Sequence, residues 1–219
     1  MLYTLEQVKE NLRTRQGKRV FFLGEGDRLT SAAKDFLTGE RIPILPASQA
    51  KIHRYVGLDG AYYEEKPEHM TQLEGNVLVP KTHPRIVFRG KLDFLQAQVI
   101  LLMLEEPTLQ KPLDEILELL RRMLKNEVLG EPFAFGSLFG KSEQELREIS
   151  QLPQKHLGIP HFMPGPKDGM TIARLNCLRT QVREAELLAV DTHREDLVRG
   201  LNRLSSAVYI LMLQRKGST

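Results

Sequence analysis

The chain has 219 residues, of which 41% are hydrophobic, so it can bury a sizeable core in one moderate domain with a small additional unit. Its formal net charge is only +3, and its lysines and arginines are scattered rather than gathered into the basic run that follows nucleic acid. Cys177 is the single cysteine, which excludes a disulfide framework and a thiolate zinc site within one chain.

Residues 1–45 have the pattern of a small separate unit that contains both helix and strand. Thr4 is placed to cap an amphipathic helix, and Arg19–Leu23 has the composition of a short strand. Thr30 is placed to cap a second helix, Ser31–Leu37. We therefore expect a small α+β appendage at this end of the chain.

Residues 46–80 show weak periodicity and scattered glycine. One tight turn is expected at Asp59-Gly60, where two short extended runs would form a hairpin. The rest of this segment is predicted to be a loop-rich connection.

From residue 81 onward the pattern turns helical. Leu92–Glu105 is apolar on most faces, as expected of a central helix, although its longest apolar run, Val99–Leu104, is too short to cross a bilayer. Ser142 begins a capping box that opens a short helix. The other expected elements are a helix with a clear 3.6-residue period around Leu113–Leu124, two structured loops, Leu129–Gly140 and Gly158–Gly165, and two long helices, Met170–Asp191 and Glu195–Gln214. Residues 81–219 thus predict an all-α fold, an antiparallel five-helix bundle, with the small α+β appendage before it.

A polar stripe runs along the predicted helix Met170–Asp191. Asn176, Arg179, Arg183 and Glu186 lie at i, i+3, i+7 and i+10, so they share one face, and apolar residues occupy another. Two arginines in so apolar a helix must reach solvent or find anionic groups, because an unpaired buried charge is very costly. From this helix alone, a surface ion pair of either arginine with Glu186 is the favoured explanation, and the next helix changes that balance.

The following helix repeats the arrangement. Asn202, Ser205 and Tyr209 lie at i, i+3 and i+7, opposite an apolar stripe. Two neighbouring helices with such stripes can enclose a polar cleft. Guanidinium groups hold phosphate oxygens and an amide can fix a base or ribose, so the cleft would suit a polyphosphate ligand.

The residues of these two stripes also resemble a known family. Arg179–Glu186 (Arg-Thr-Gln-Val-Arg-Glu-Ala-Glu) and Leu201–Ser206 (Leu-Asn-Arg-Leu-Ser-Ser) are similar to the C-terminal motifs of ATP:cob(I)alamin adenosyltransferases. Upstream, Met163-Pro164-Gly165 resembles the Leu-Pro-Gly-Gly element of that family, and Pro80–Asp93 resembles its lysine, Asp-Pro-Arg and Gly-x-x-Asp-Glu-Leu segment. The order and spacing agree over nearly the whole chain. Arg28–Leu37 and Leu129–Pro132 resemble the ethanolamine-utilisation type rather than the propanediol type.

This resemblance implies a cobalamin adenosyltransferase-like fold and transfer of the 5′-deoxyadenosyl group of ATP to reduced cobalamin, with Mg²⁺ accompanying ATP. It implies a homo-oligomer, expected to be a trimer with sites between subunits, and it implies no nucleic-acid or membrane partner. A cobalamin reductase and an ethanolamine ammonia-lyase are the expected functional partners. The acidic start without an apolar segment fits a cytoplasmic protein, for which association with a bacterial microcompartment is an open alternative.

The resemblance also implies roles for single residues. Arg183, Glu186 and Asn202 would contact ATP. Asp93 would pair with Arg179 across a subunit boundary and orient it. The phosphate-binding residues would be Lys81, Thr82 and Arg85.

An apolar side chain would displace the lower axial ligand of cobalamin and make the cobalt easier to reduce. Phe162 is the candidate, and anchoring of its loop in the core is an equally good explanation of this residue. Phe133, Phe135 and Phe139 are the alternatives.

Two features of related proteins are absent from the sequence. The Thr-x-x-Gly-Asp-x-Gly ATP loop of the propanediol type is missing, since Gly24–Asp27 lies in the appended unit at a different distance from Lys81, so residues 76–85 are expected to bind phosphate differently. Some ethanolamine-type members carry a histidine followed by a Cys-Cys-x-x-Cys cluster, and none of those cysteines is present. Because lone histidines such as His53 and His69 are seldom ligands, we predict no zinc or iron site.

Two other kinds of protein fit the same residues. A non-catalytic cobalamin carrier would bind cobalamin but would give the two arginines and Asn202 no nucleotide to hold. A scaffold protein of a microcompartment could use the Thr30–Leu37 helix for docking, although packing within the chain explains that helix as well.

Overall fold

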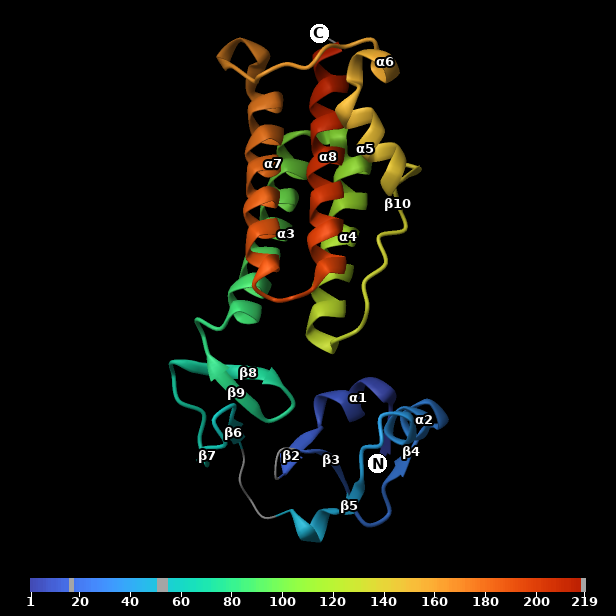
Figure 1. Cartoon of the computed structure of the whole chain (residues 1–219), viewed down its shortest axis with the longest axis vertical. Helices are drawn as coiled ribbons and strands as arrows, with labels where there is room; N and C mark the ends of the chain where they lie inside the picture. The colour runs from blue at the N-terminus through green and yellow to red at the C-terminus, as the bar shows by residue number, and fades with distance from the viewer. Residues whose placement is uncertain (16–17, 51–54, 218–219) are drawn as a thin grey trace. The chain divides into compact units, whose positions relative to one another are not determined.

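The computed structural model describes residues 1–15, 18–50 and 55–217, and the chain divides into two compact units, Met1–His83 and Pro84–Thr219 (Figure 1). The second unit is the predicted all-α bundle, and the first contains the predicted α+β part. His53 lies outside the described residues. Among the described helices, none has both the length and the apolar character needed to cross a membrane.

The beginning of the first unit combines two short helices with two small sheets. Thr4 and Thr30 cap the two helices as predicted, and Thr4 forms a full capping box with Gln7. Val8, Phe21 and Leu37 are buried together in its core. The elements are β1 (Leu2–Tyr3), α1 (Leu5–Glu10), β2 (Arg13–Arg15), β3 (Lys18–Leu23), β4 (Arg28–Leu29), α2 (Ser31–Gly39), β5 (Ile44–Pro46) and the 3₁₀ turn η1 (Ala47–Gln49). β1 pairs with β4, and β3 pairs antiparallel with β2 and parallel with β5.

The segment predicted to be loop-rich instead forms a four-stranded sheet in the order β7-β6-β9-β8. The predicted hairpin at Asp59-Gly60 is present, because Gly60 has a positive φ of 83° and the flanking strands pair antiparallel. The strands β6 (Tyr55–Gly57), β7 (Tyr62–Tyr63), β8 (Met70–Glu74) and β9 (Val77–Pro80) are short. Strands of this length carry little alternation of their own, and the central β6–β9 pairing is a parallel contact between distant residues, so the local pattern did not reveal them.

The turn between β8 and β9 ties this sheet to the beginning of the unit. The buried side chain of Asn76 accepts a hydrogen bond of 2.9 Å from the backbone N–H of Thr14. A side chain at Gly75 would lie 2.2 Å from the backbone oxygen of Leu12, so only glycine permits this approach. The predicted unit of residues 1–45 therefore packs with the segment that follows it.

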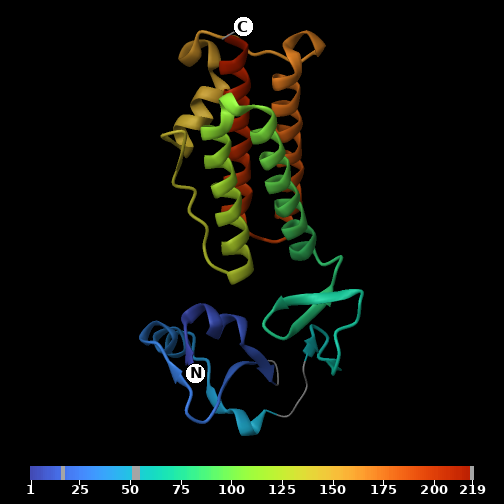
Figure 2. The same ribbon diagram turned by 180° about the vertical axis from the view of Figure 1, so that it is seen from behind.

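The bundle consists of four long helices and a shorter fifth. Figures 1 and 2 show α7 beside α8, with α3 packed on α7, α4 packed on α3, and α5 lying along α8. The helices are α3 (Pro84–Glu105), α4 (Gln110–Leu129), α5 (Glu143–Gln151), α7 (Gly169–Val190) and α8 (Glu195–Gly217), with a one-turn helix α6 (Pro153–Leu157) and the 3₁₀ turns η2 (Pro107–Leu109) and η3 (Pro166–Asp168). Leucine, isoleucine and valine side chains from all five fill one continuous core.

The loop between α4 and α5 is part of the core. Phe133 and Phe135 are buried, and a side chain at Gly200 of α8 would lie 2.8 Å from the Phe133 ring, so the missing side chain of Gly200 lets the loop approach α8. Phe139 and Gly140 form the turn of a small hairpin, both with positive φ, between β10 (Ser137–Leu138) and β11 (Lys141–Ser142). Burial therefore explains Phe133 and Phe135, and Phe139 is partly buried against the same core.

Candidate functional site

A cavity of about 370 Å³ lies between α7 and α8, where the two polar stripes face each other. Asn202 Nδ2 donates a hydrogen bond of 2.8 Å to Glu186 Oε1, which links the two helices. Among the described residues, no ion pair joins Glu186 to an arginine of its own helix, so the alternative of a surface pair along α7 is not what the structure contains. The cavity is lined by Ser150, Arg179, Arg183, Glu186, Leu187, Asn202, Ser205, Ser206 and Tyr209.

A larger cavity of about 780 Å³ adjoins the first one, and the two share Ser150, Glu186, Asn202 and Ser206. Its walls come from α5, from the α7–α8 turn and from the start of α8. The basic residues that line it are Arg147, His193, Arg194, Arg199 and Arg203, and the acidic ones are Glu186 and Glu195. The two cavities together form a polar site with an excess of arginine.

The electrostatics of this site favour an anion. Burial lowers the pKa of the Arg179 guanidinium, and the charge of Arg183 lowers it further. Burial likewise lowers the pKa of Arg203, with repulsion from Arg147 as the next cause. A polyphosphate bound between these groups would relieve the repulsion and replace the lost hydration.

Sequence reasoning did not single out Arg147, Arg199 or Arg203 as site residues. Arg203 lies inside the motif Leu201–Ser206 and donates a hydrogen bond of 2.7 Å to Asn202 Oδ1, so its position next to Asn202 was a usable signal. Nothing in the sequence around Arg147 on α5 pointed to α8, because only tertiary packing brings these helices together.

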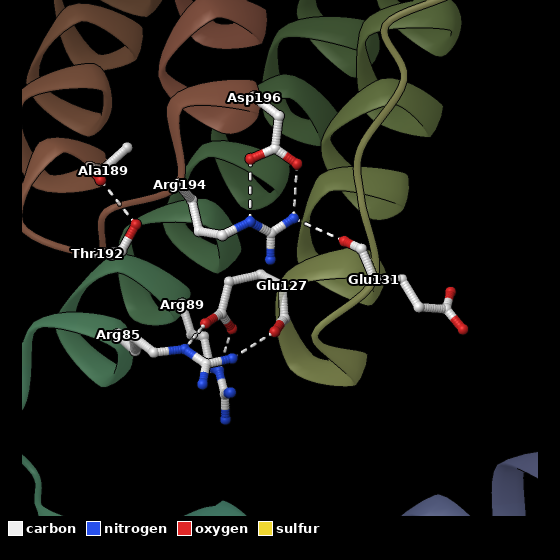
Figure 3. Close-up of polar contacts among 8 residues, drawn as sticks. All are labelled: Arg85, Arg89, Glu127, Glu131, Ala189, Thr192, Arg194 and Asp196. Carbon is white, nitrogen blue, oxygen red and sulfur yellow. Dashed lines mark hydrogen bonds and ion pairs between the residues drawn. The ribbon is translucent and has the colours of Figure 1, made fainter. Parts of the chain in front are cut away.

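Arg85, a predicted phosphate ligand, is held in an ion-pair cluster at one end of the bundle (Figure 3). Arg85 and Arg89 of α3 both form ion pairs with Glu127 of α4, whose side chain is fully buried. Arg85 Nη2 also donates a hydrogen bond of 2.6 Å to the backbone oxygen of Glu127. In this structure the Arg85 guanidinium therefore neutralises a protein carboxylate, and contact with a phosphate would require it to share or leave Glu127.

A second ion pair in Figure 3 joins the α7–α8 turn to the loop after α4. Arg194 Nη2 lies 2.8 Å from Asp196 Oδ2 and donates a hydrogen bond of 2.6 Å to the backbone oxygen of Glu131. Asp196 also accepts a hydrogen bond of 2.7 Å from the backbone N–H of Phe133. Hydrogen bonding to Arg194 is the main cause that lowers the pKa of Asp196 to about 2.

This shift makes a testable prediction for acid stability. Because the folded-state pKa of Asp196 is about 2 and the ordinary value is 3.8, the carboxylate stabilises the fold above about pH 4, and this contribution is lost as the pH falls toward 2. Asp196→Asn should cost about 1 kcal/mol at neutral pH, after allowance for solvent screening, and nothing near pH 2. Urea unfolding of the parent and the variant between pH 2 and 7 measures the difference. A difference that does not change with pH would contradict the assignment.

The other predicted residues lie in three separate places. Lys81 and Thr82 are exposed in the turn after β9, in the first unit. Asp93 is exposed on the outer face of α3. Phe162 lies in the loop before η3 and packs against the bundle core, while the neighbouring Met163 is 93% exposed.

The described residues contain no group of three or more histidine, cysteine, aspartate or glutamate side chains that could hold a metal ion. The single cysteine, Cys177, is exposed on α7.

The fold and the site define a helical-bundle protein with an arginine-rich cavity. Residues 61–214 match the sequence profile of the cobalamin adenosyltransferase family. The chain belongs to this family.

The names of two curated relatives agree with this assignment to the family. The chain is 35% identical over 158 residues to the corrinoid adenosyltransferase EutT of Salmonella typhimurium and 34% identical to that of Escherichia coli K12. These matches cover 68% of this chain and 59% of each relative, so the chain spans about three fifths of the length of the curated relatives it matches.

Solved structures with the same fold include variants of a PduO-type ATP:corrinoid adenosyltransferase from Lactobacillus reuteri. One, in complex with cobalamin and ATP, has a TM-score of 0.51 and 22% identity, covering 67% of this chain and 87% of the other. Another, in complex with ATP, has a TM-score of 0.52 and 22% identity, covering 72% and 94%. At this level of identity the similarity establishes the fold.

Proposed function

We propose that this chain transfers the 5′-deoxyadenosyl group of ATP to cob(I)alamin and serves ethanolamine utilisation. The observation that carries the proposal is the convergence of Arg179, Arg183, Glu186 and Asn202 on one cavity in a member of the cobalamin adenosyltransferase family. The names of the relatives, which are corrinoid adenosyltransferases, support the same substrate class.

The reaction needs placement and charge neutralisation more than acid–base chemistry. The cobalt of cob(I)alamin attacks the 5′ carbon of ATP with its own electron pair, a cobalt–carbon bond forms, and the carbon–oxygen bond breaks. Triphosphate leaves with that bonding pair. The protein must hold ATP in line with cobalt and neutralise the leaving group, which are tasks for guanidinium groups, lysine and the Mg²⁺ bound to ATP.

The two cavities suit the two ends of ATP. The larger cavity, with Arg147, Arg199 and Arg203, offers the greater excess of positive charge, so we place the β- and γ-phosphates there and the α-phosphate next to Arg183 of the smaller cavity. Asn202 and Glu186 lie on the boundary between the cavities and would hold the ribose. The 5′ carbon would then point along the smaller cavity toward Tyr209 and the loop that carries Phe162, where cobalamin would bind.

The outer face of α3 supports an oligomer. Val87, Phe94 and Leu101 lie at seven-residue spacing and are 39%, 44% and 52% exposed, and Leu104 is 75% exposed. An apolar stripe along a bundle helix marks an association surface. Asp93 lies beside this stripe, so a second copy packed there would meet its carboxylate, and we retain the pairing of Asp93 with Arg179 of the partner subunit as part of the proposal. A trimer is the assembly we propose.

Asp93→Asn tests that pairing. Loss of a charged pair across a subunit boundary should lower activity by about ten- to a hundredfold and weaken assembly, because the partner arginine is left without its counter-charge. Turnover and sedimentation mass measure the two effects. Asp114→Asn, at another exposed aspartate of the bundle on α4, is the matched control. Unchanged kinetics together with unchanged mass would refute the pairing.

Three further residues are proposed phosphate ligands, with less structural support than the arginines of the cavities: Lys81, Thr82 and Arg85. Lys81 and Thr82 are exposed and available in the first unit. Arg85 would have to be shared with Glu127.

A cobalamin reductase and an ethanolamine ammonia-lyase are the proposed functional partners, and association with a microcompartment is the proposed location.

The direct test is an anaerobic assay of the full chain with chemically reduced cobalamin and MgATP, followed by the absorbance of adenosylcobalamin. We expect product only when ATP is present. A chain that binds cobalamin but forms no product with ATP would be the carrier of the alternative interpretation, and a chain that binds neither would be a scaffold.

A further inference from the structure

Tyr209 joins the two halves of the proposed site. It is the last residue of the α8 stripe and lines the smaller cavity together with Arg179 and Arg183. Its hydroxyl oxygen lies 3.1 Å from His161 Nδ1 and accepts a hydrogen bond of 3.4 Å from the backbone N–H of Phe162. One side chain therefore contacts both the nucleotide cavity and the loop of the candidate cobalamin residue.

The hydrogen bonds around His161 indicate which atoms donate and which accept between His161 and Tyr209. His161 Nε2 lies 3.1 Å from the backbone oxygen of Gln151, which can only accept, so Nε2 carries the hydrogen. In the neutral ring Nδ1 is then an acceptor, and the Tyr209 hydroxyl donates to it. The same hydroxyl accepts a hydrogen bond from the Phe162 N–H, so it acts as both donor and acceptor.

The rings around Tyr209 add packing to these bonds. Its ring stacks with His161 at 5.9 Å and 14° and with Phe162 at 6.2 Å and 21°. The Arg179 guanidinium lies 6.0 Å from the centre of the Tyr209 ring. The Tyr209 ring therefore contacts both the arginine and the loop, and its hydroxyl bonds to the loop backbone.

Other contacts also hold the loop near Phe162: the Phe162 ring packs against the core with its centre 6.0 Å from Lys216 Nζ, and His161 bonds to the backbone oxygen of Gln151. Gly158, Pro160 and Pro164 surround Phe162 in the sequence, and Met163 is almost fully exposed. The far end of the loop is held by Asp168, which accepts a hydrogen bond of 2.7 Å from the Gly165 N–H and pairs with Lys216. The Tyr209 hydroxyl differs from these contacts because it accepts a hydrogen bond from the backbone N–H of Phe162 itself.

We propose that Tyr209 is a positioning residue whose hydroxyl fixes the face that Phe162 presents to the corrin ring. This inference rests on the proposed function, in which an apolar side chain must replace the lower axial ligand before Co(II) can be reduced. A side chain can occupy that place reproducibly only if its backbone is held.

Tyr209→Phe tests the inference, since it removes the hydroxyl and keeps the ring. With cob(II)alamin and a reductant, we expect adenosylcobalamin formation to fall about tenfold, the effect of losing one or two hydrogen bonds. With cobalamin already reduced to cob(I)alamin, which has no lower ligand to displace, the rate should change less than about threefold, and KM for ATP should not change. Electron paramagnetic resonance should show a smaller fraction of four-coordinate cob(II)alamin.

Two comparisons give the result its meaning. Tyr62→Phe, at an exposed tyrosine of β7 in the first unit, should leave both rates unchanged. Phe162→Ala should reproduce the cob(II)alamin defect, and the double variant should be no worse than Phe162→Ala alone, as expected for residues that act in sequence. Amide hydrogen exchange of the loop should accelerate about tenfold in Tyr209→Phe, independently of activity.

An equal fall of the rate in both assays would mean that Tyr209 supports the fold or binds the nucleotide, and it would overturn the inference. Rates of Tyr209→Phe equal to those of the parent in both assays would also overturn it. Inactivity of the parent chain in both assays would overturn the proposed function and this inference with it.

Discussion

Arg183→Ala is expected to lower adenosylcobalamin formation by about a hundredfold or more while leaving the fold intact. The Arg183 side chain is exposed at the mouth of the smaller cavity, so its removal opens no void in the core. Its proposed task is to neutralise the phosphates of ATP as triphosphate departs, and removing one such donor from a prepared site commonly costs two to three orders of magnitude, roughly 3–4 kcal/mol. Steady-state kinetics with cob(I)alamin and MgATP measure the change.

Matched variants separate the charge from its geometry. Arg183→Lys keeps the charge but not the two-pronged geometry, so it should recover only part of the activity. Arg121→Ala removes an exposed arginine of α4 whose ion pair with Glu118 lies on the surface, and it should leave activity unchanged. Asn202→Ala should resemble Arg183→Ala in activity. Parent-like turnover in both Arg183→Ala and Asn202→Ala would remove the basis of the site assignment.

Glu127→Ala is expected to destabilise the chain by about 3–5 kcal/mol, the cost of leaving a buried charged group without its counter-ion. Glu127 is fully buried and forms ion pairs with two arginines of α3, which are 23% and 15% exposed. Without the carboxylate, both guanidinium groups lose the negative charge that they share, although Arg85 keeps its hydrogen bond to the backbone oxygen of residue 127. For a chain of this size, the loss corresponds to a fall in Tm of about 10 °C.

Thermal and urea unfolding measure the effect. Glu118→Ala, which removes a half-exposed partner from the surface pair with Arg121, is the control and should unfold close to the parent. Glu127→Gln should fall between them, because the amide keeps an acceptor but no charge. If Glu127→Ala unfolds like Glu118→Ala, the cluster does not hold α3 and α4 together.

The Glu127→Gln variant also tests whether Arg85 binds ATP. If Arg85 serves ATP as well as Glu127, its release in Glu127→Gln should change KM for ATP at a temperature where the variant remains folded. An unchanged KM would mean that Arg85 belongs to the bundle alone. Variants of the ion-pair cluster in Figure 3 therefore measure how much the cluster stabilises the bundle, and they also show whether Arg85 belongs to the phosphate site.

Local sequence was sufficient wherever neighbours along the chain decide the structure. The capping residues Thr4, Thr30 and Ser142 begin their helices as predicted, because a cap bonds to amides only two or three residues away. Each polar stripe also follows from helical spacing, so Arg179, Arg183 and Glu186 could be assigned to one face of α7 and Asn202 to the stripe of α8 before any coordinates. The motifs that the family shares lie on these stripes.

Tertiary structure alone decided what depends on distant residues. It formed a sheet from residues 55–80, in which β6 and β9 pair across an intervening stretch, brought Arg147 of α5 to the site, and placed Glu127 against Arg85, 42 residues away. These contacts have no period or spacing to read, because they arise when a core closes and buried charges must be paired. Residues close together in the sequence thus define the helices and carry the family motifs, and the packing of those helices decides which arginines line the cavities and which hold the bundle together.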